Sequence, residues 1–145
     1  VEWALFVARL LRWSVSAGAE ARDLRDTVQR LAEKHSETVR DAVTEVLKRT
    51  GEDNKAVTMR VGPACELKSG VPAALHNLLG STTFTEAVRK NIYACGDSCG
   101  RAMVVGSLGG ALFGDGEETG IPKAWYERLT RGEEIRTYVE AIVTG

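Results

Sequence analysis

Between residues 98 and 114 the chain is apolar, and small residues recur in it at every fourth position. Ala102, Gly106, Gly110 and Gly114 fall on one side of an α-helix, because side chains four apart lie above one another on the same face. A face without side chains lets a second backbone approach closely. The pattern therefore predicts a helix that packs tightly against a neighbour along this glycine stripe.

The same helical period runs through most of the chain. Apolar residues recur at spacings of three and four in residues 1–16 and 20–49, and charged residues fill the opposite face of the second stretch. Ser36 is a competent N-cap, so we expect a break at His35 and Ser36, with His35 in or near the core. Further helices are predicted at residues 72–79, from Thr83 or Thr85 to about 93, at 122–129 and at 133–143.

For two of these helices the apolar pattern predicts which residues face the core. In the first, large apolar side chains flank the inward positions, so we expect burial on more than one side. The expected inward positions are Leu5, Ala8, Leu11 and Val15 in the first helix, and Ala87, Val88, Ile92 and Tyr93 in the helix after Thr83.

Residues 51–71 differ from the rest of the chain. Glycine and proline recur in this stretch, and apolar residues alternate with polar ones over only a few positions. We expect a long connecting loop here, and such loops in compact domains are often functional. Pro72 then fits the first turn of the helix that follows. No run alternates long enough to found a sheet, so we predict an all-α fold in a single domain over residues 1–145.

Composition sets broad limits on partners and location. The formal net charge is -1, which gives no electrostatic reason to expect nucleic acid or an anionic membrane as partner. The uncharged stretch 102–114 is shorter than the roughly 20 residues that a membrane-spanning helix needs. Cys65, Cys95 and Cys99 are an odd set without a Cys-x-x-Cys pair, which favours reduced thiols and a cytoplasmic protein.

Asp97 stands immediately before the glycine-rich helix, in the sequence Gly96-Asp97-Ser98-Cys99-Gly100. A carboxylate in this position can accept hydrogen bonds from the free N–H groups of the first helical turn. The same oxygens can instead hold a cation. Local chemistry leaves both roles open, although a cap is the more common one.

Several short motifs, in order and spacing, resemble the C-terminal half of the ADP-ribosylglycohydrolases, and most closely the divergent branch that includes the J-type crystallins. The resemblance covers most of residues 55 to 130. Its motifs are Val61-Gly62-Pro63-Ala64-Cys65, Gly70-Val71-Pro72-Ala73-Ala74-Leu75-His76, Phe84-Thr85-Glu86-Ala87-Val88-Arg89, Gly96-Asp97-Ser98 with the helix that follows, and Gly120-Ile121-Pro122 with Trp125 and Leu129.

The resemblance implies a helical bundle of which this chain is the C-terminal part, and a binuclear magnesium site that hydrolyses bonds between ADP-ribose and an acceptor. It assigns Asp97 to the metal and places Ser98, Cys99 and His76 near an ADP-ribose-type ligand. It also implies that the site is completed by an N-terminal half of the same fold; a homo-oligomer is the other partner we consider.

The sequence departs from the active members of that family in two ways. Their motif reads Gly-Asp-Thr-Asp-Thr, whereas Cys99 and Gly100 stand here in place of the second carboxylate and the hydroxyl. Magnesium prefers oxygen ligands, so Cys99 cannot substitute for the missing carboxylate. No Thr-Asp-Asp-Thr cluster occurs elsewhere in the chain. Two hypotheses follow: a glycohydrolase-like protein that is inactive as this chain alone, or a non-catalytic helical protein with a structural or interaction role.

Overall fold

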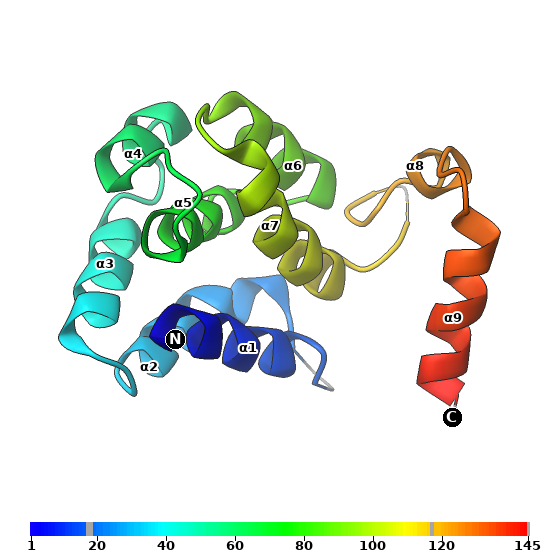
Figure 1. Ribbon diagram of the computed structural model, residues 1–145, viewed down its shortest axis with the longest axis horizontal. Coiled ribbons are helices and arrows are strands. Elements are labelled where there is room, and N and C mark those ends of the chain that lie inside the picture. Colours follow the sequence, from blue (N-terminus) through cyan, green and yellow to red (C-terminus); the bar gives the residue numbers. More distant parts are fainter. Residues whose placement is uncertain (17–18, 117, 145) are drawn as a thin grey trace.

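The computed structural model describes residues 1–16, 19–116 and 118–144 of the protein. The regular secondary structure of these residues is helical, apart from one isolated bridge between Asp115 and Ile121, so the all-α prediction is confirmed (Figure 1). The helices are α1 (Glu2–Ser14), the 3-10 turn η1 (Ala21–Asp23), α2 (Leu24–Ala32), α3 (Glu37–Lys48), α4 (Asn54–Val61), α5 (Leu67–Leu79), α6 (Phe84–Tyr93), α7 (Ser98–Phe113), α8 (Lys123–Glu127) and α9 (Gly132–Thr144). Among the described helices none is both long and apolar enough to cross a bilayer.

Helix α5 lies at the centre of the body, and α1, α3, α4, α6 and α7 pack around it. Its residues 71–78 are buried without interruption. A helix that is apolar and small on nearly every side is stable only when neighbours cover every face, and the run Val71-Pro72-Ala73-Ala74-Leu75 has this character. The core therefore forms around α5.

The segment predicted to be a long loop contains a helix instead. Asp53 caps α4 by accepting a hydrogen bond from the N–H of Ala56 at 2.8 Å, and Val57 on that helix is fully buried. The prediction was wrong because the glycines delimit a short helix rather than a loop. Helix α5 also begins earlier than expected, at Leu67, so Pro72 lies in its interior rather than in its first turn.

The inward faces of α1 and α6 also differ from the predictions. Helix α1 buries the larger apolar side chains, Trp3, Phe6 and Leu10, and leaves Leu5 and Val15 exposed. In α6, Ile92 and Tyr93 are exposed, and the buried side chain of that turn is the polar Asn91. Periodicity located both helices correctly but not their rotation about the helix axis.

The glycine stripe of α7 does not face a neighbouring helix. A Cβ atom at Gly106 or Gly114 would meet nothing within 4 Å. The packed glycine is Gly109, where a Cβ atom would lie 3.2 Å from the Phe84 ring and 3.3 Å from Leu78. The buried side of α7 is instead formed by Arg101, Val104, Val105, Leu108 and Gly109.

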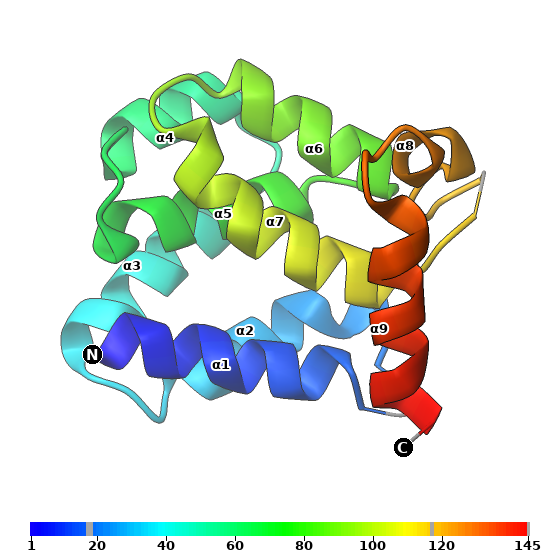
Figure 2. The ribbon, with the colours of Figure 1, turned by 45° about the vertical axis from the view of Figure 1, so that its right-hand side comes forward.

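The chain ends in an arm formed by α8 and α9 that projects from the body (Figures 1 and 2). Its base is fixed, because the N–H of Phe84 donates to the carbonyl of Thr119 at 2.7 Å and the rings of Phe84 and Trp125 lie 6.0 Å apart. Beyond this base, the described residues give α9 no close packing against a helix of the body.

Candidate functional site

The candidate site is the turn between α6 and α7, which contains Asp97. Cys95 and Gly96 both have left-handed backbone conformations, with φ of 64° and 66°. A side chain at Gly96 would collide with Pro63, whose carbonyl oxygen would lie 2.5 Å from the added Cβ atom. That same carbonyl accepts a hydrogen bond from the N–H of Asp97 at 2.9 Å. The turn is therefore held tightly against the segment that follows α4.

Two buried polar side chains, Asn91 and Arg101, lock this turn from the inside. Each is 2% exposed. The Nδ2 group of Asn91 donates to the carbonyl of Ser98 at 2.9 Å, and its Oδ1 accepts from Nε of Arg101 at 2.9 Å. Arg101 Nη2 donates to the carbonyls of Asn91 and Cys95, at the end of α6. A cation at the C-terminus of a helix is favourable because the free carbonyls there carry partial negative charge.

The charge of Arg101 is desolvated on most sides. Burial lowers the pKa of its guanidinium, and the negative charge of Asp97 opposes this effect. Arg101 Nη1 has no hydrogen-bond partner among the described residues. Since a guanidinium remains charged in proteins, Arg101 places a fixed positive charge behind the turn.

Asp97 acts as the N-cap of α7. Its Oδ1 accepts a hydrogen bond from the N–H of Gly100 at 3.0 Å, so the carboxylate satisfies one of the free donors of the first turn. The side chain is half-buried, and it faces the helix rather than a cleft. Of the two roles that the sequence left open, the structure displays the cap.

The other residues predicted for the site are not all brought together. Ser98 and Cys99 lie in the first turn of α7 beside Asp97, and the Cys99 thiol is exposed. His76 lies on α5 and is 2% exposed, with its Nε2 atom 2.9 Å from the carbonyl oxygen of Arg49 at the end of α3. It therefore lies in the core, apart from the Asp97 turn, and its contact with a ligand stays a prediction.

The donors around Asp97 do not fit a magnesium ion. Magnesium takes six oxygen ligands in near-octahedral geometry. Asp97 contributes one carboxylate, already used as a cap, and its neighbours Cys95 and Cys99 carry thiols. Across the described ranges, no three His, Cys, Asp or Glu side chains are grouped so that they could hold a metal ion.

Sequence reasoning missed Asn91 and Arg101, which fix the geometry of the turn. A polar residue in the last turn of a helix ordinarily faces solvent, and the period of α6 favoured its apolar neighbours as the inward side. One signal was present: Arg101 is the only charged residue between Asp97 and Asp115. A lone charge in an apolar helix needs partners if it is buried.

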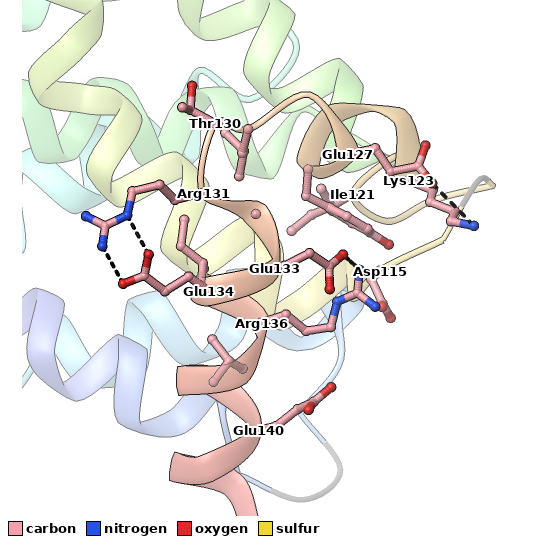
Figure 3. Close-up of a pocket in the computed structure, with 15 residues that line it drawn as sticks. Asp115, Ile121, Lys123, Glu127, Thr130, Arg131, Glu133, Glu134, Arg136 and Glu140 are labelled. Carbon is pink, nitrogen blue, oxygen red and sulfur yellow. Dashed lines mark hydrogen bonds and ion pairs between the residues drawn. The ribbon is translucent and has the colours of Figure 1, made fainter.

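The open cleft of the arm lies elsewhere. It has a volume of about 870 Å³ and is lined by residues of α8, α9 and the loop before them (Figure 3). Asp97 and His76 are not among its lining residues. The cleft is thus separate from the candidate site.

Comparison with known proteins shows to which protein family this chain belongs. The sequence model of the ADP-ribosylglycohydrolases matches residues 1–145, the whole chain. The chain belongs to the ADP-ribosylglycohydrolase family. It is also 32% identical over 89 residues to Crystallin J1A of Tripedalia cystophora, a match that covers 61% of this chain and 27% of that protein. No solved structure matches the chain.

Membership in the ADP-ribosylglycohydrolase family confirms the resemblance found in the sequence, and the match to Crystallin J1A lies in the branch that the motifs indicated. The matched region spans about a quarter of the length of that relative. The name of the family describes a glycohydrolase, and magnesium stays an expectation from the sequence resemblance. The Asp97 turn of this chain does not by itself provide the ligands for a magnesium ion.

Proposed function

We propose that these 145 residues form a non-catalytic helical protein of the ADP-ribosylglycohydrolase family, with a structural role. The observation that carries the proposal is the use of Asp97: its carboxylate caps α7, and the residues two positions before and after it, Cys95 and Cys99, carry thiols rather than oxygen donors. A glycohydrolase of this kind needs several carboxylates that converge on its metal ions. A structural role is also supported by the similarity to a protein named Crystallin J1A.

Calorimetric titration with magnesium, together with an assay for free ADP-ribose, tests this proposal. We expect no micromolar magnesium binding and no release of ADP-ribose from an ADP-ribosylated protein. The capping role adds a second readout: Asp97→Asn keeps a side-chain acceptor and loses only the charge, so it should be more stable than Asp97→Ala, which should lose about 1 kcal/mol or more. Micromolar binding or turnover by the unmodified chain would overturn the proposal.

A second function is supported by the match of the family model to the whole chain. In this alternative, an N-terminal half of the same fold supplies the missing carboxylates, the completed site binds magnesium and an ADP-ribose-type ligand, and Asp97 turns from the helix to the metal. The variant Cys99→Asp with Gly100→Thr then restores the oxygen donors, because the side chain at position 100 displaces the Asp97 carboxylate from its cap. The helix N-terminus opposes a bound cation slightly, so the carboxylates decide the outcome.

The second function is tested in the presence of an N-terminal half that carries its own acidic motif. Magnesium affinity should rise in the Cys99→Asp, Gly100→Thr variant and fall again when Asp97→Asn is added. Unchanged affinity in both variants would remove Asp97 from the metal site. For either function we also propose a reducing, cytoplasmic location, which the three exposed, unpaired cysteines support.

A further inference from the structure

A second pocket lies where the start of α2 meets the ends of α5 and α7. Its volume is about 420 Å³. Pockets for small organic ligands usually measure about 300–1,000 Å³. Neither the Asp97 turn nor the arm of α8 and α9 contributes a lining residue. The pocket is therefore separate from both sites described above.

The interior of this pocket is apolar. Leu24 at the start of α2 and Leu78 near the end of α5 are each 2% exposed and belong to the core. Leu79 and Phe113, the last residues of α5 and α7, are half-buried and pack against the same core. All four side chains line the pocket. This surface favours a ligand with an apolar body.

The charge at the margin of the pocket is positive. Its only charged lining residues are Arg22 and Arg25, and their sequence neighbours Asp23 and Asp26 do not line it. Arg22 pairs with Glu20 at 2.9 Å, but these side chains are 76% and 52% exposed. An ion pair in such contact with water contributes little, so Arg22 can exchange this partner at low cost.

Arg25 is fixed in place, and its charge is not neutralised. Its Nη1 donates to Oγ1 of Thr50 at 3.0 Å, and its Nη2 donates to the carbonyl of Leu47 at 2.7 Å. Both partners are neutral, and no carboxylate among the described residues pairs with Arg25. A guanidinium has five N–H donors, so donors remain for an anion. The side chain is exposed and open to a ligand.

Two hydroxyl groups also line the pocket, but their hydrogens are already engaged. Ser81 donates to the carbonyl of Asn77 at 2.6 Å, and Thr82 donates to the carboxylate of Glu86 at 3.0 Å. In this arrangement the two oxygens can only accept hydrogen bonds. An anion in the pocket is therefore bound by the arginines and not by these hydroxyls.

We propose that this pocket binds a small amphiphilic anion, a carboxylate that carries a short apolar chain. The chain covers Leu24, Leu78 and Phe113, and the carboxylate pairs with Arg25. A carboxylate suits this position because its two oxygens match the paired N–H donors of a guanidinium. Arg22 adds a second positive charge at the margin.

Titration of the full chain with hexanoate, followed by the NMR shifts of its backbone amides, tests the proposal. We expect saturable binding with a dissociation constant of about 1 mM or below, and shifts at Leu24, Leu79 and Phe113. Two control ligands separate the chain from the charge. Acetate lacks the apolar chain and 1-hexanol lacks the carboxylate, so each should bind at least about tenfold more weakly.

Variants of Arg25 test its role in the pocket. Arg25→Gln should weaken hexanoate binding at least about tenfold, because a charge-assisted hydrogen bond is lost. It should leave the shifts caused by 1-hexanol unchanged, which shows that the pocket is intact. Arg25→Lys keeps the charge and should recover part of the affinity. Arg89→Gln removes the same charge at an exposed position of α6 and is the matched control, with hexanoate binding unchanged.

Three outcomes would overturn the proposal. The first is the absence of saturable shifts up to about 20 mM hexanoate, well above the expected dissociation constant. The second is equal affinity for hexanoate and 1-hexanol, because the pocket would then not recognise the charge. The third is equal hexanoate affinity in the parent and Arg25→Gln, or shifts confined to α9, because the ligand would then bind elsewhere on the protein.

Discussion

The carboxylate of Asp97 occupies the space that a side chain at Gly100 would need. A Cβ atom at position 100 would lie 2.5 Å from Oδ2 of Asp97, while the backbone N–H of Gly100 donates to Oδ1 at 3.0 Å. The helix cap and the absence of a side chain at position 100 therefore depend on each other. In this chain the arrangement directs the carboxylate toward the helix rather than toward a metal ion.

Gly100→Ala should move the Asp97 carboxylate and weaken the cap. The loss of a cap costs about 0.5–2 kcal/mol. Gly106→Ala is the control on the same helix, because a Cβ atom there meets nothing within 4 Å and alanine favours a helix interior by up to about 1 kcal/mol. In urea denaturation, Gly100→Ala should unfold at a lower urea concentration than Gly106→Ala. Equal midpoints would show that the cap contributes nothing.

Gly109 should tolerate a large side chain less well than Gly106. At Gly109 the Phe84 ring and Leu78 would contact an added Cβ atom at 3.2 and 3.3 Å, so Gly109→Leu should cost about 1–3 kcal/mol or more through overpacking. Gly106→Leu should be close to neutral, the reverse of what the glycine stripe suggested. The midpoints of urea denaturation of the two variants measure this difference. A Gly109→Leu protein as stable as the parent would contradict the packing described for α7.

Arg101→Met should destabilise the protein through the carbonyl groups at the end of α6. The substitution removes the donors to Asn91 and to the carbonyl of Cys95 in a buried region. Each buried polar group left without a partner costs about 1–3 kcal/mol. Arg89→Met, at an exposed position of α6, is the matched control and should change stability by less than about 0.5 kcal/mol. Similar losses in the two variants would mean that the Arg101 contacts contribute little.

Stability should fall as the pH is lowered through the titration of His35. Burial and the nearby Arg9 guanidinium hold the pKa of His35 below its ordinary value of 6.5, with Glu2 opposing them. The guanidinium nitrogen Nη1 of Arg9 lies 2.9 Å from Nε2 of His35, a contact that requires the neutral ring. The unfolded chain therefore binds more protons than the folded chain just below pH 6.5, so stability is fully present above that pH and is lost below it.

Urea denaturation between pH 5 and 7.5 measures this dependence. His35→Gln keeps a polar side chain without the titration, so its stability should vary less with pH over the same range. An identical pH slope in the parent and the variant would assign the dependence to other groups.

The positions of most helices follow from the sequence because the signals that begin and end them are local. Thr83 and Asp97 each cap a helix by accepting a hydrogen bond from an N–H three residues onward, and such a contact needs no neighbour from another part of the chain. Ser36 stands at the N-cap position of α3, as its sequence predicts, but its hydroxyl donates to the carboxylate of Glu2 instead of accepting from the first turn. The all-α class and the family motifs were also readable at this level.

The tertiary structure decided which side of each helix is buried. The period of α7 fits Gly106 and Gly109 equally well, and only the positions of Phe84 and Leu78 select Gly109. Likewise, the burial of Asn91 instead of Ile92 depends on Arg101, ten residues away on the next helix. The rotation of a helix about its axis is set by the sum of its contacts with neighbours, and those neighbours come from distant parts of the chain. A period of 3.6 residues locates a helix, whereas packing orients it.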